Sequence, residues 1–214
     1  MLLLIHIPKS RLKLMAQVFS RLGGPTVMMP LLVLFLLEQG NLLHLQFLPL
    51  IILILTLTWL LPILFFIFCY QRGWISDWNA TQRRERLLPY TFTWLCYTLL
   101  ILNLDKIGLN ISIQSIFLKF YWLLFLLWFI TFFYKVSVHA ALNTFAAFVF
   151  INLLVPKNSI YSLFFYGLAL LWIFLVAWSR LYLRRHTVGQ LLLGFLLGCY
   201  SFYFWPLLFE SWII

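Results

Sequence analysis

Long apolar runs, broken by short polar islands, constrain the fold of this 214-residue chain more than any other feature. Hydrophobic residues make up 64% of the sequence and charged residues only 9%, whereas a soluble domain carries about 25% charged residues. A single core could not bury so much apolar surface, so most of it must face lipid or neighbouring membrane helices. A backbone inside a bilayer satisfies its hydrogen bonds as a helix. We therefore predict an all-α, polytopic membrane protein in which residues 1–214 form one integral domain.

The apolar runs are long enough for six or seven membrane spans, since a helix crosses the hydrocarbon core in about 20 residues. We predict a helical bundle with spans at roughly 23–37, 48–70, 87–104, 116–134, 138–155, 160–178 and 187–209. The first run is short and contains Pro25 and Pro30, so it is either a tilted span or a re-entrant segment. That choice decides between seven spans and six. In the last run, Gly194 and Gly198 have the spacing that lets two membrane helices pack closely.

The basic residues divide unequally between the two sides of this topology. Twelve of the 15 fall on one side: Lys9, Arg11, Lys13, Arg21, Arg72, Arg83, Arg84, Arg86, Lys135, Arg180, Arg184 and Arg185. Because cytoplasmic loops carry the excess of Lys and Arg, we predict that this side is cytoplasmic, in a bacterial inner membrane. Segment 1–22 is predicted to be a basic interfacial segment. The basic residues behind the net charge of +10 lie between apolar runs rather than along one helix face. This placement favours membrane lipids over nucleic acid as partners.

Three polar islands fall on the predicted cytoplasmic side, at 77–89, 135–140 and 179–190. Two membrane crossings separate each island from the next, so we expect all three to converge at one surface. Their cations are suited to phosphate, because Arg binds phosphate oxygens in pairs and Lys adds a point charge. These cations are Arg83, Arg86, Lys135 and Arg180. The islands also contain His139 and His186, and a histidine can serve as nucleophile or as proton donor.

The third island, SRLYLRRHTVGQ, resembles the third motif of the PAP2 (type 2 phosphatidic acid phosphatase) superfamily, S-R-x5-H-x3-D, through Ser179, Arg180 and His186. The second island, KVSVH, is similar to the family's P-S-G-H motif through Ser137 and His139. These two motifs occur in the family's order.

The family's first motif, K-x6-R-P, is matched loosely. Arg86 stands at its arginine, Pro89 follows two leucines later, and Asn79 stands where the lysine would fall. Arg83, three residues before Arg86, could take the place of that lysine on the same helical face. The resemblance therefore covers a PAP2-like catalytic region at 77–200 and implies a PAP2-like helical fold.

The resemblance implies a metal-independent reaction in which His186 attacks phosphorus to form a phosphohistidine and His139 protonates the leaving group. The implied phosphate-binding residues are Arg83, Arg86, Lys135, Ser137, Ser179 and Arg180. Ser137 is also expected to cap a helix. Gln190 replaces the family's aspartate next to the nucleophile. An amide can fix the tautomer of His186, but it does not stabilise the imidazolium as a carboxylate does. Asp77 or Glu85 could supply that charge.

We expect no metal and no cofactor, because the five acidic residues are scattered and no carboxylate pair is placed to hold Mg²⁺. The expected function is hydrolysis of lipid phosphate esters or diphosphates, such as phosphatidic acid, phosphatidylglycerophosphate or isoprenyl phosphates. Two alternatives stay open. The chain could bind phospholipid with little or no turnover, or it could transfer a phosphoryl group between lipids.

Overall fold

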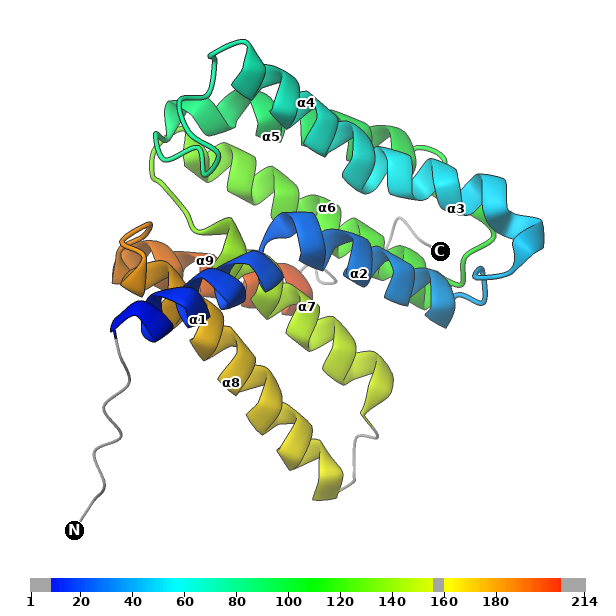
Figure 1. The fold of residues 1–214 in the computed structure, drawn as a ribbon. Helices are drawn as coiled ribbons and strands as arrows, with labels where there is room; N and C mark the ends of the chain where they lie inside the picture. Colours follow the sequence, from blue (N-terminus) through cyan, green and yellow to red (C-terminus); the bar gives the residue numbers. More distant parts are fainter. Residues whose placement is uncertain (1–8, 156–159, 205–214) are drawn as a thin grey trace.

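The computed structural model describes residues 9–155 and 160–204, and all regular secondary structure in these ranges is helical (Figure 1). The helices are α1 (Lys9–Leu22), α2 (Pro25–Gln39), α3 (Leu48–Leu55), α4 (Leu61–Gln71), α5 (Leu87–Ile101), α6 (Ile111–Thr131), α7 (Val138–Leu154), α8 (Ile160–Tyr182) and α9 (Val188–Tyr203). A π-helical turn, η2 (Thr56–Leu60), joins α3 to α4, and three 3₁₀ turns are η1 (Leu45–Phe47), η3 (Arg84–Arg86) and η4 (Leu104–Ile107).

Three helices are long and apolar enough to cross a membrane, namely Leu45–Gln71, Ile111–Thr131 and Tyr161–Tyr182. A fourth candidate is the pair Ser10–Leu22 and Pro25–Gln39, which bends by 43° at its break. The part of the chain that the structure describes is thus an all-helical protein with three or four candidate membrane spans.

The other predicted spans correspond to shorter helices. Helix α5 has 15 residues, α7 has 17 and α9 has 16. At 1.5 Å per residue these helices are about 22–26 Å long, which is less than the roughly 30 Å of a hydrocarbon core. Helix α5 ends at Ile101, three residues before the predicted end. Residues 1–8 of the predicted interfacial segment and 205–209 of the predicted last span lie outside the described residues.

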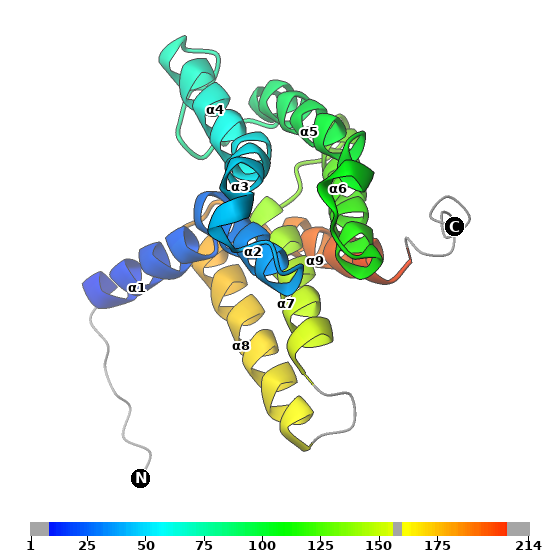
Figure 2. The ribbon, with the colours of Figure 1, turned by 90° about the vertical axis from the view of Figure 1, so that its right-hand side faces the viewer.

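The helices form two groups that share α2 and α6 (Figures 1 and 2). In the first group, the α3–α4 rod packs against α5, and α5 packs against α6. In the second group, α7 packs against α8 and α9, while α1 packs against α8. Helix α2 contacts α7 and η2, and α9 contacts α6, so the two groups are joined through these helices.

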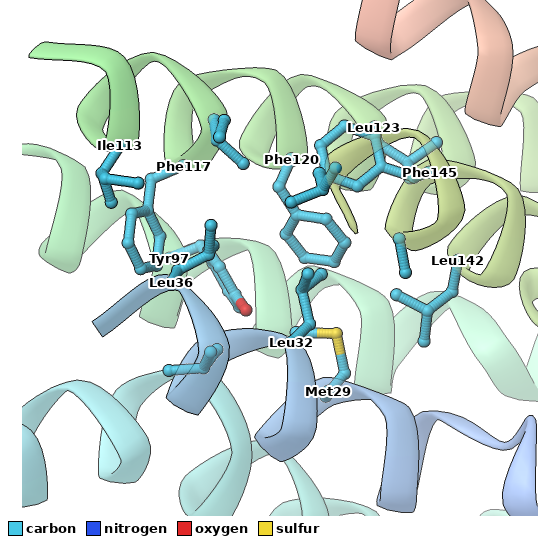
Figure 3. Packing of buried hydrophobic residues seen from close by; sticks show 14 of the residues in the cluster. Met29, Leu32, Leu36, Tyr97, Ile113, Phe117, Phe120, Leu123, Leu142 and Phe145 are labelled. Atoms are coloured by element: carbon cyan, nitrogen blue, oxygen red, sulfur yellow. The ribbon is translucent and has the colours of Figure 1, made fainter. Parts of the chain in front are cut away.

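The main core lies where α2, α5, α6 and α7 meet (Figure 3). Leu32 and Leu36 of α2 face Phe117 and Phe120 of α6. The ring of Phe145, on α7, meets the Phe120 ring in a T-shaped contact with 5.3 Å between the ring centroids. Leu32 is only 2% exposed, so this face of α2 is fully packed. The first predicted span is therefore an integral part of the bundle, although Pro25 begins it after a sharp break.

Close packing of α7 against α9 depends on two glycines. A Cβ added to Gly194 would lie 2.5 Å from the Ser137 carbonyl oxygen, and one added to Gly198 would lie 2.6 Å from the Ala141 carbonyl oxygen. Only glycine allows the two backbones to come this close. The packing role predicted for these glycines is confirmed. As a result, the start of α9 lies against the start of α7, where the Ser137 N–H donates to the Gln190 carbonyl at 3.2 Å.

Candidate functional site

The three polar islands meet at one end of the bundle, as predicted. Arg86 of the first island donates from Nη1 to the Val136 carbonyl of the second island at 2.9 Å. Lys135 of the second island donates from Nζ to the Arg185 carbonyl of the third at 3.2 Å. Residues more than 40 positions apart in the sequence are therefore held together by direct hydrogen bonds.

A cavity of about 1020 Å³ opens beside these contacts. Its polar end is lined by both candidate histidines and by cations from α1 and the islands: Lys13, Arg21, Arg86, His139, Arg180, Arg185 and His186. The described residues that line it include no Asp and no Glu. The cavity wall is therefore strongly cationic with no acidic side chain to balance it, which favours an anion as ligand.

From this polar end the cavity extends into the bundle along one face of α5. Arg86, Pro89, Thr93 and Tyr97 line it at helical spacing, and the eleven residue steps from Arg86 to Tyr97 correspond to about 16 Å of helix. Apolar side chains of α2, η2, α4 and α6 complete this inner part, including Met29, Trp59, Ile63, Phe120 and Leu124. We call this region the apolar arm. The cavity thus joins a cationic end to a mainly apolar interior.

Arg180 is buried in the cavity wall near the end of α8 and is 3% exposed. Its Nη1 donates to the Ser20 hydroxyl at 2.6 Å, whereas its Nε has no hydrogen-bond partner among the residues that the structure describes. A buried donor without a partner is costly, and a charged one more so. An anion bound in the cavity would balance the charge of this side chain.

Arg86 is also buried, with an exposed fraction of 6%. Its Nε donates to the Ala80 carbonyl at 2.8 Å and its Nη1 to the Val136 carbonyl at 2.9 Å. These bonds tie the loop before α5 to the segment before α7, so Arg86 has a structural role. Because the side chain also lines the cavity, its charge acts on any ligand there.

His186 lies in the turn between α8 and α9 and is 8% exposed. Helix α8 ends at Tyr182, Arg184 then adopts a left-handed conformation with φ of 54°, and the Arg185 N–H closes the turn by donating to the Arg180 carbonyl at 3.0 Å. Thr187 then caps α9 through its side chain. This tight turn between the two helices brings the His186 ring back to the cavity wall.

Gln190 contacts His186, as expected, through the cap of α9. The Gln190 Oε1 atom lies 2.9 Å from His186 Nδ1 and accepts the Thr187 N–H at 3.3 Å. Because a backbone N–H donates to Oε1, that atom is the acceptor, so Nδ1 must carry the proton. His186 Nε2 is then unprotonated, with its lone pair free to act as a nucleophile.

Burial lowers the pKa of His186 to about 3, and the positive charges of Arg86 and Arg180 lower it in the same direction. The imidazole is therefore neutral near pH 7. Burial and the same two arginines also lower the pKa of Lys135, which reflects the crowding of cations at this end of the bundle. A bound dianion would relieve that repulsion.

His139, on the first turn of α7, is partly buried and lines the cavity. It is close enough to His186 and Arg180 to interact with both electrostatically. Its ring lies beside the α1–α2 break, where a Cβ added to Gly24 would be in ordinary contact with His139 Nε2 at 3.5 Å. Arg86, Arg180 and both histidines are therefore gathered around one cavity.

Four of the predicted phosphate ligands do not line the main cavity. Ser137 and Ser179 are fully buried and line neither this cavity nor the smaller pocket described below. The Ser137 hydroxyl accepts the Ala140 N–H at 3.4 Å, which confirms only its expected role as a helix cap. The Ser179 hydroxyl donates to the Val176 carbonyl at 2.6 Å. Arg83 donates to the Phe132 carbonyl and ties the first island to the end of α6.

The fourth, Lys135, lines a separate, open pocket of about 360 Å³ together with Gln190, Arg184 and Arg185. His186 lines this small pocket and the main cavity. Lys135 therefore lies near His186 but does not line the main cavity.

The two acidic residues of the first island do not supply the missing carboxylate. The Asp77 side chain accepts the Asn79 N–H at 2.7 Å and the Thr81 N–H at 3.0 Å, and Glu85 accepts the Ser76 N–H at 3.1 Å. Both therefore fold the loop before α5 and make no hydrogen bond to His186. Within residues 9–155 and 160–204, no three His, Cys, Asp or Glu side chains lie close enough to hold a metal ion.

The structure adds residues of α1 that the motifs did not indicate. Lys13, Gln17, Ser20 and Arg21 line the cavity, although the sequence analysis placed α1 only at the membrane interface. Their spacing places them on one face of a helix, but that face combines charged and uncharged polar residues, and its sequence did not indicate a binding site. Arg185 also lines the cavity, which could have been predicted because it directly precedes His186 in the sequence.

Comparison with models of protein families, with curated proteins and with solved structures found no match to this chain.

Proposed function

We propose that this protein is a metal-independent membrane phosphatase of the PAP2 type, acting on lipid phosphate esters or diphosphates. The observation that carries the proposal is the buried Arg180 side chain, which lines a cationic cavity and whose Nε has no hydrogen-bond partner among the described residues. A phosphate monoester carries about two negative charges near neutral pH and offers several acceptor oxygens. It would offer acceptors to the Arg180 guanidinium and balance the charges of Arg86 and Arg180.

The tautomer of His186 supports nucleophilic attack by its Nε2 atom, and the PAP2 pattern gives His139 the role of proton donor. The His186 Nε2 lone pair attacks phosphorus, the bond from phosphorus to the ester oxygen breaks, and His139 gives a proton to that oxygen. Water then attacks the phosphohistidine, giving its proton to His139 and releasing phosphate and His186. Arg180 and Arg86 stabilise the charge on the phosphoryl oxygens during both steps.

The apolar arm favours a lipid substrate over a soluble one. A phosphate held between Arg86 and His186 would leave its ester substituent pointing along α5 toward Tyr97. Phosphatidic acid, phosphatidylglycerophosphate and isoprenyl phosphates all carry a chain that could occupy about 16 Å of such a space. The proposal includes a bundle of six or seven spans in a bacterial inner membrane, with the cavity opening at the cytoplasmic face.

Gln190 favours a second candidate function. It fixes the tautomer of His186 but, unlike a carboxylate, carries no charge to stabilise the imidazolium. The same cavity would then bind a phospholipid headgroup and tail with little or no turnover. A third outcome, transfer of the phosphoryl group to a lipid alcohol, differs from hydrolysis only in the acceptor that attacks the phosphohistidine.

The test is phosphate release from phosphatidic acid, phosphatidylglycerophosphate and isoprenyl phosphates by the purified protein in detergent micelles. We expect His186→Ala to abolish release, while His44→Ala, an exposed histidine in the loop after α2, behaves like the wild type. No release from any substrate, with no phosphohistidine trapped at neutral or alkaline pH, would reject the enzyme and leave the lipid-binding candidate. Label moving to an added lipid alcohol in place of free phosphate would identify a phosphotransferase.

A further inference from the structure

We propose that Ser20, on α1 and outside the PAP2-like region, is a positioning residue that aims the Arg180 guanidinium into the cavity. This inference rests on the proposed role of Arg180 as a phosphate ligand. The Ser20 hydroxyl accepts a hydrogen bond from Arg180 Nη1 at 2.6 Å. Ser20 is 8% exposed, so water competes little for the bond.

The hydrogen bond from Arg180 to Ser20 restricts the orientation of the whole guanidinium group. The group is planar and its donors form a rigid fork, so holding Nη1 fixes the direction of the others. Arg180 lines the cavity, and with Nη1 on Ser20 its Nε has no partner among the described residues. Without Ser20 the side chain could turn about its last bonds, and the unpaired donors would no longer be aimed at one point.

Small residues on α1 bring Ser20 within reach of α8. Ala16 is fully buried, and a Cβ added to Gly23 would lie 2.6 Å from Val176 Cγ2. Val176 and Arg180 are four residues apart and so share one face of α8. The same close approach of the two helices therefore packs Gly23 on Val176 and places Ser20 on Arg180.

The break between α1 and α2 also fixes the neighbouring histidine. Asn143 Nδ2 donates to the Gly23 carbonyl and to the His139 carbonyl, each at 2.7 Å. The Ser20 carbonyl faces the His139 ring, and Gly24 lies beside that ring. The segment from Ser20 to Gly24 thus sets the positions of Arg180 and His139 relative to each other, which phosphoryl transfer requires.

The experiment compares binding of orthovanadate, a tetrahedral phosphate mimic, and phosphate release in Ser20→Ala, Ser20→Thr and the matched control Ser10→Ala. Ser10 is exposed on the same helix. Calorimetry in detergent micelles reports binding without turnover. We expect Ser20→Ala to weaken vanadate binding about tenfold, because a hydrogen bond to a charged group is lost. Ser20→Thr keeps the hydroxyl and should stay within about threefold of the wild type, as should Ser10→Ala.

A double-mutant cycle separates positioning from a general effect on folding. In an Arg180→Gln background, Ser20→Ala should change vanadate binding less than about twofold, because its partner is absent. As a second perturbation, Gly23→Ala should weaken binding by pushing α1 away from Val176, and Val176→Ala should restore it in the double variant.

Equal binding by Ser20→Ala and Ser10→Ala would overturn the positioning role, as would an undiminished effect of Ser20→Ala in the Arg180→Gln background. If the wild type binds vanadate and Ser20→Ala weakens that binding, but no lipid phosphate is hydrolysed, the positioning role stands and the phosphatase proposal fails. If the wild type binds no vanadate, the phosphate role of Arg180 fails, and this inference fails with it.

Discussion

Replacing Gln190 by Glu should accelerate the proposed reaction, because it adds a charge to His186 while keeping the geometry. The Gln190 side-chain oxygen accepts from His186 Nδ1 at 2.9 Å and from the Thr187 N–H at 3.3 Å. A Glu carboxylate has nearly the same shape and accepts both bonds. It also lies on the first turn of α9, where a negative charge is favourable.

The magnitude follows from the change in the His186 hydrogen bond. During attack on phosphorus the ring becomes positively charged, and a bond from Nδ1–H to a carboxylate is stronger than one to an amide. Net values are about 1 kcal/mol for neutral hydrogen bonds and about 1.5–3 kcal/mol for bonds to charged groups. A gain of about 1.4 kcal/mol in the transition state corresponds to about tenfold in rate. The carboxylate should also raise the pKa of His186 from its value of about 3.

The assay is single-turnover formation of phosphohistidine, with Gln190→Leu as the comparison variant. We expect Gln190→Glu to react about tenfold faster than the wild type and Gln190→Leu to react more slowly, because leucine cannot hold the tautomer. The reasoning is refuted if a folded Gln190→Glu protein reacts no faster than the wild type. If the wild type is inactive and only Gln190→Glu turns over, the wild type is the lipid-binding form of this site.

Four further predictions test the site and the fold. Because the folded pKa of His186 lies near 3 and its ordinary value is 6.5, the ligand-free protein should lose about 2 kcal/mol of stability between pH 7.5 and pH 5; thermal unfolding of His186→Asn should lack that part of the pH dependence. Gly194→Ala should destabilise the protein by about 1–3 kcal/mol by overpacking α7 against α9, whereas Gly167→Ala, in open space on α8, should not. Thr93→Trp should fill the apolar arm and slow hydrolysis of long-chain lipid phosphates while sparing a water-soluble aryl phosphate; equal slowing of both would place the tail elsewhere. A cysteine at the exposed Arg84 should react with an impermeant maleimide only after cell lysis, and labelling of intact cells would reverse the predicted topology.

The meeting of the three islands could be predicted because it depends on parity alone. An even number of crossings between islands returns each one to the same side, and parity survives errors in span length. The helices α5, α7 and α9 are shorter than predicted, yet Arg86, Lys135 and His186 still meet. The contact between His186 and Gln190 was also predictable from spacing, although it forms through a helix cap rather than along one helical face.

The role of individual side chains at this meeting point could not be predicted, because it depends on directions that spacing does not set. Ser179 and Arg180 are adjacent, yet the first bonds back to its own helix and the second turns into the cavity wall. The role of Ser20 on α1 could not be predicted either. Ser20 reaches Arg180 because Ala16 and Gly23 allow α1 and α8 to approach closely. Such a contact leaves no motif, since its parts are small residues on one helix and a cation about 160 positions later. A short motif can therefore identify the groups that perform a reaction, while the residues that aim them are found only from the packing between helices.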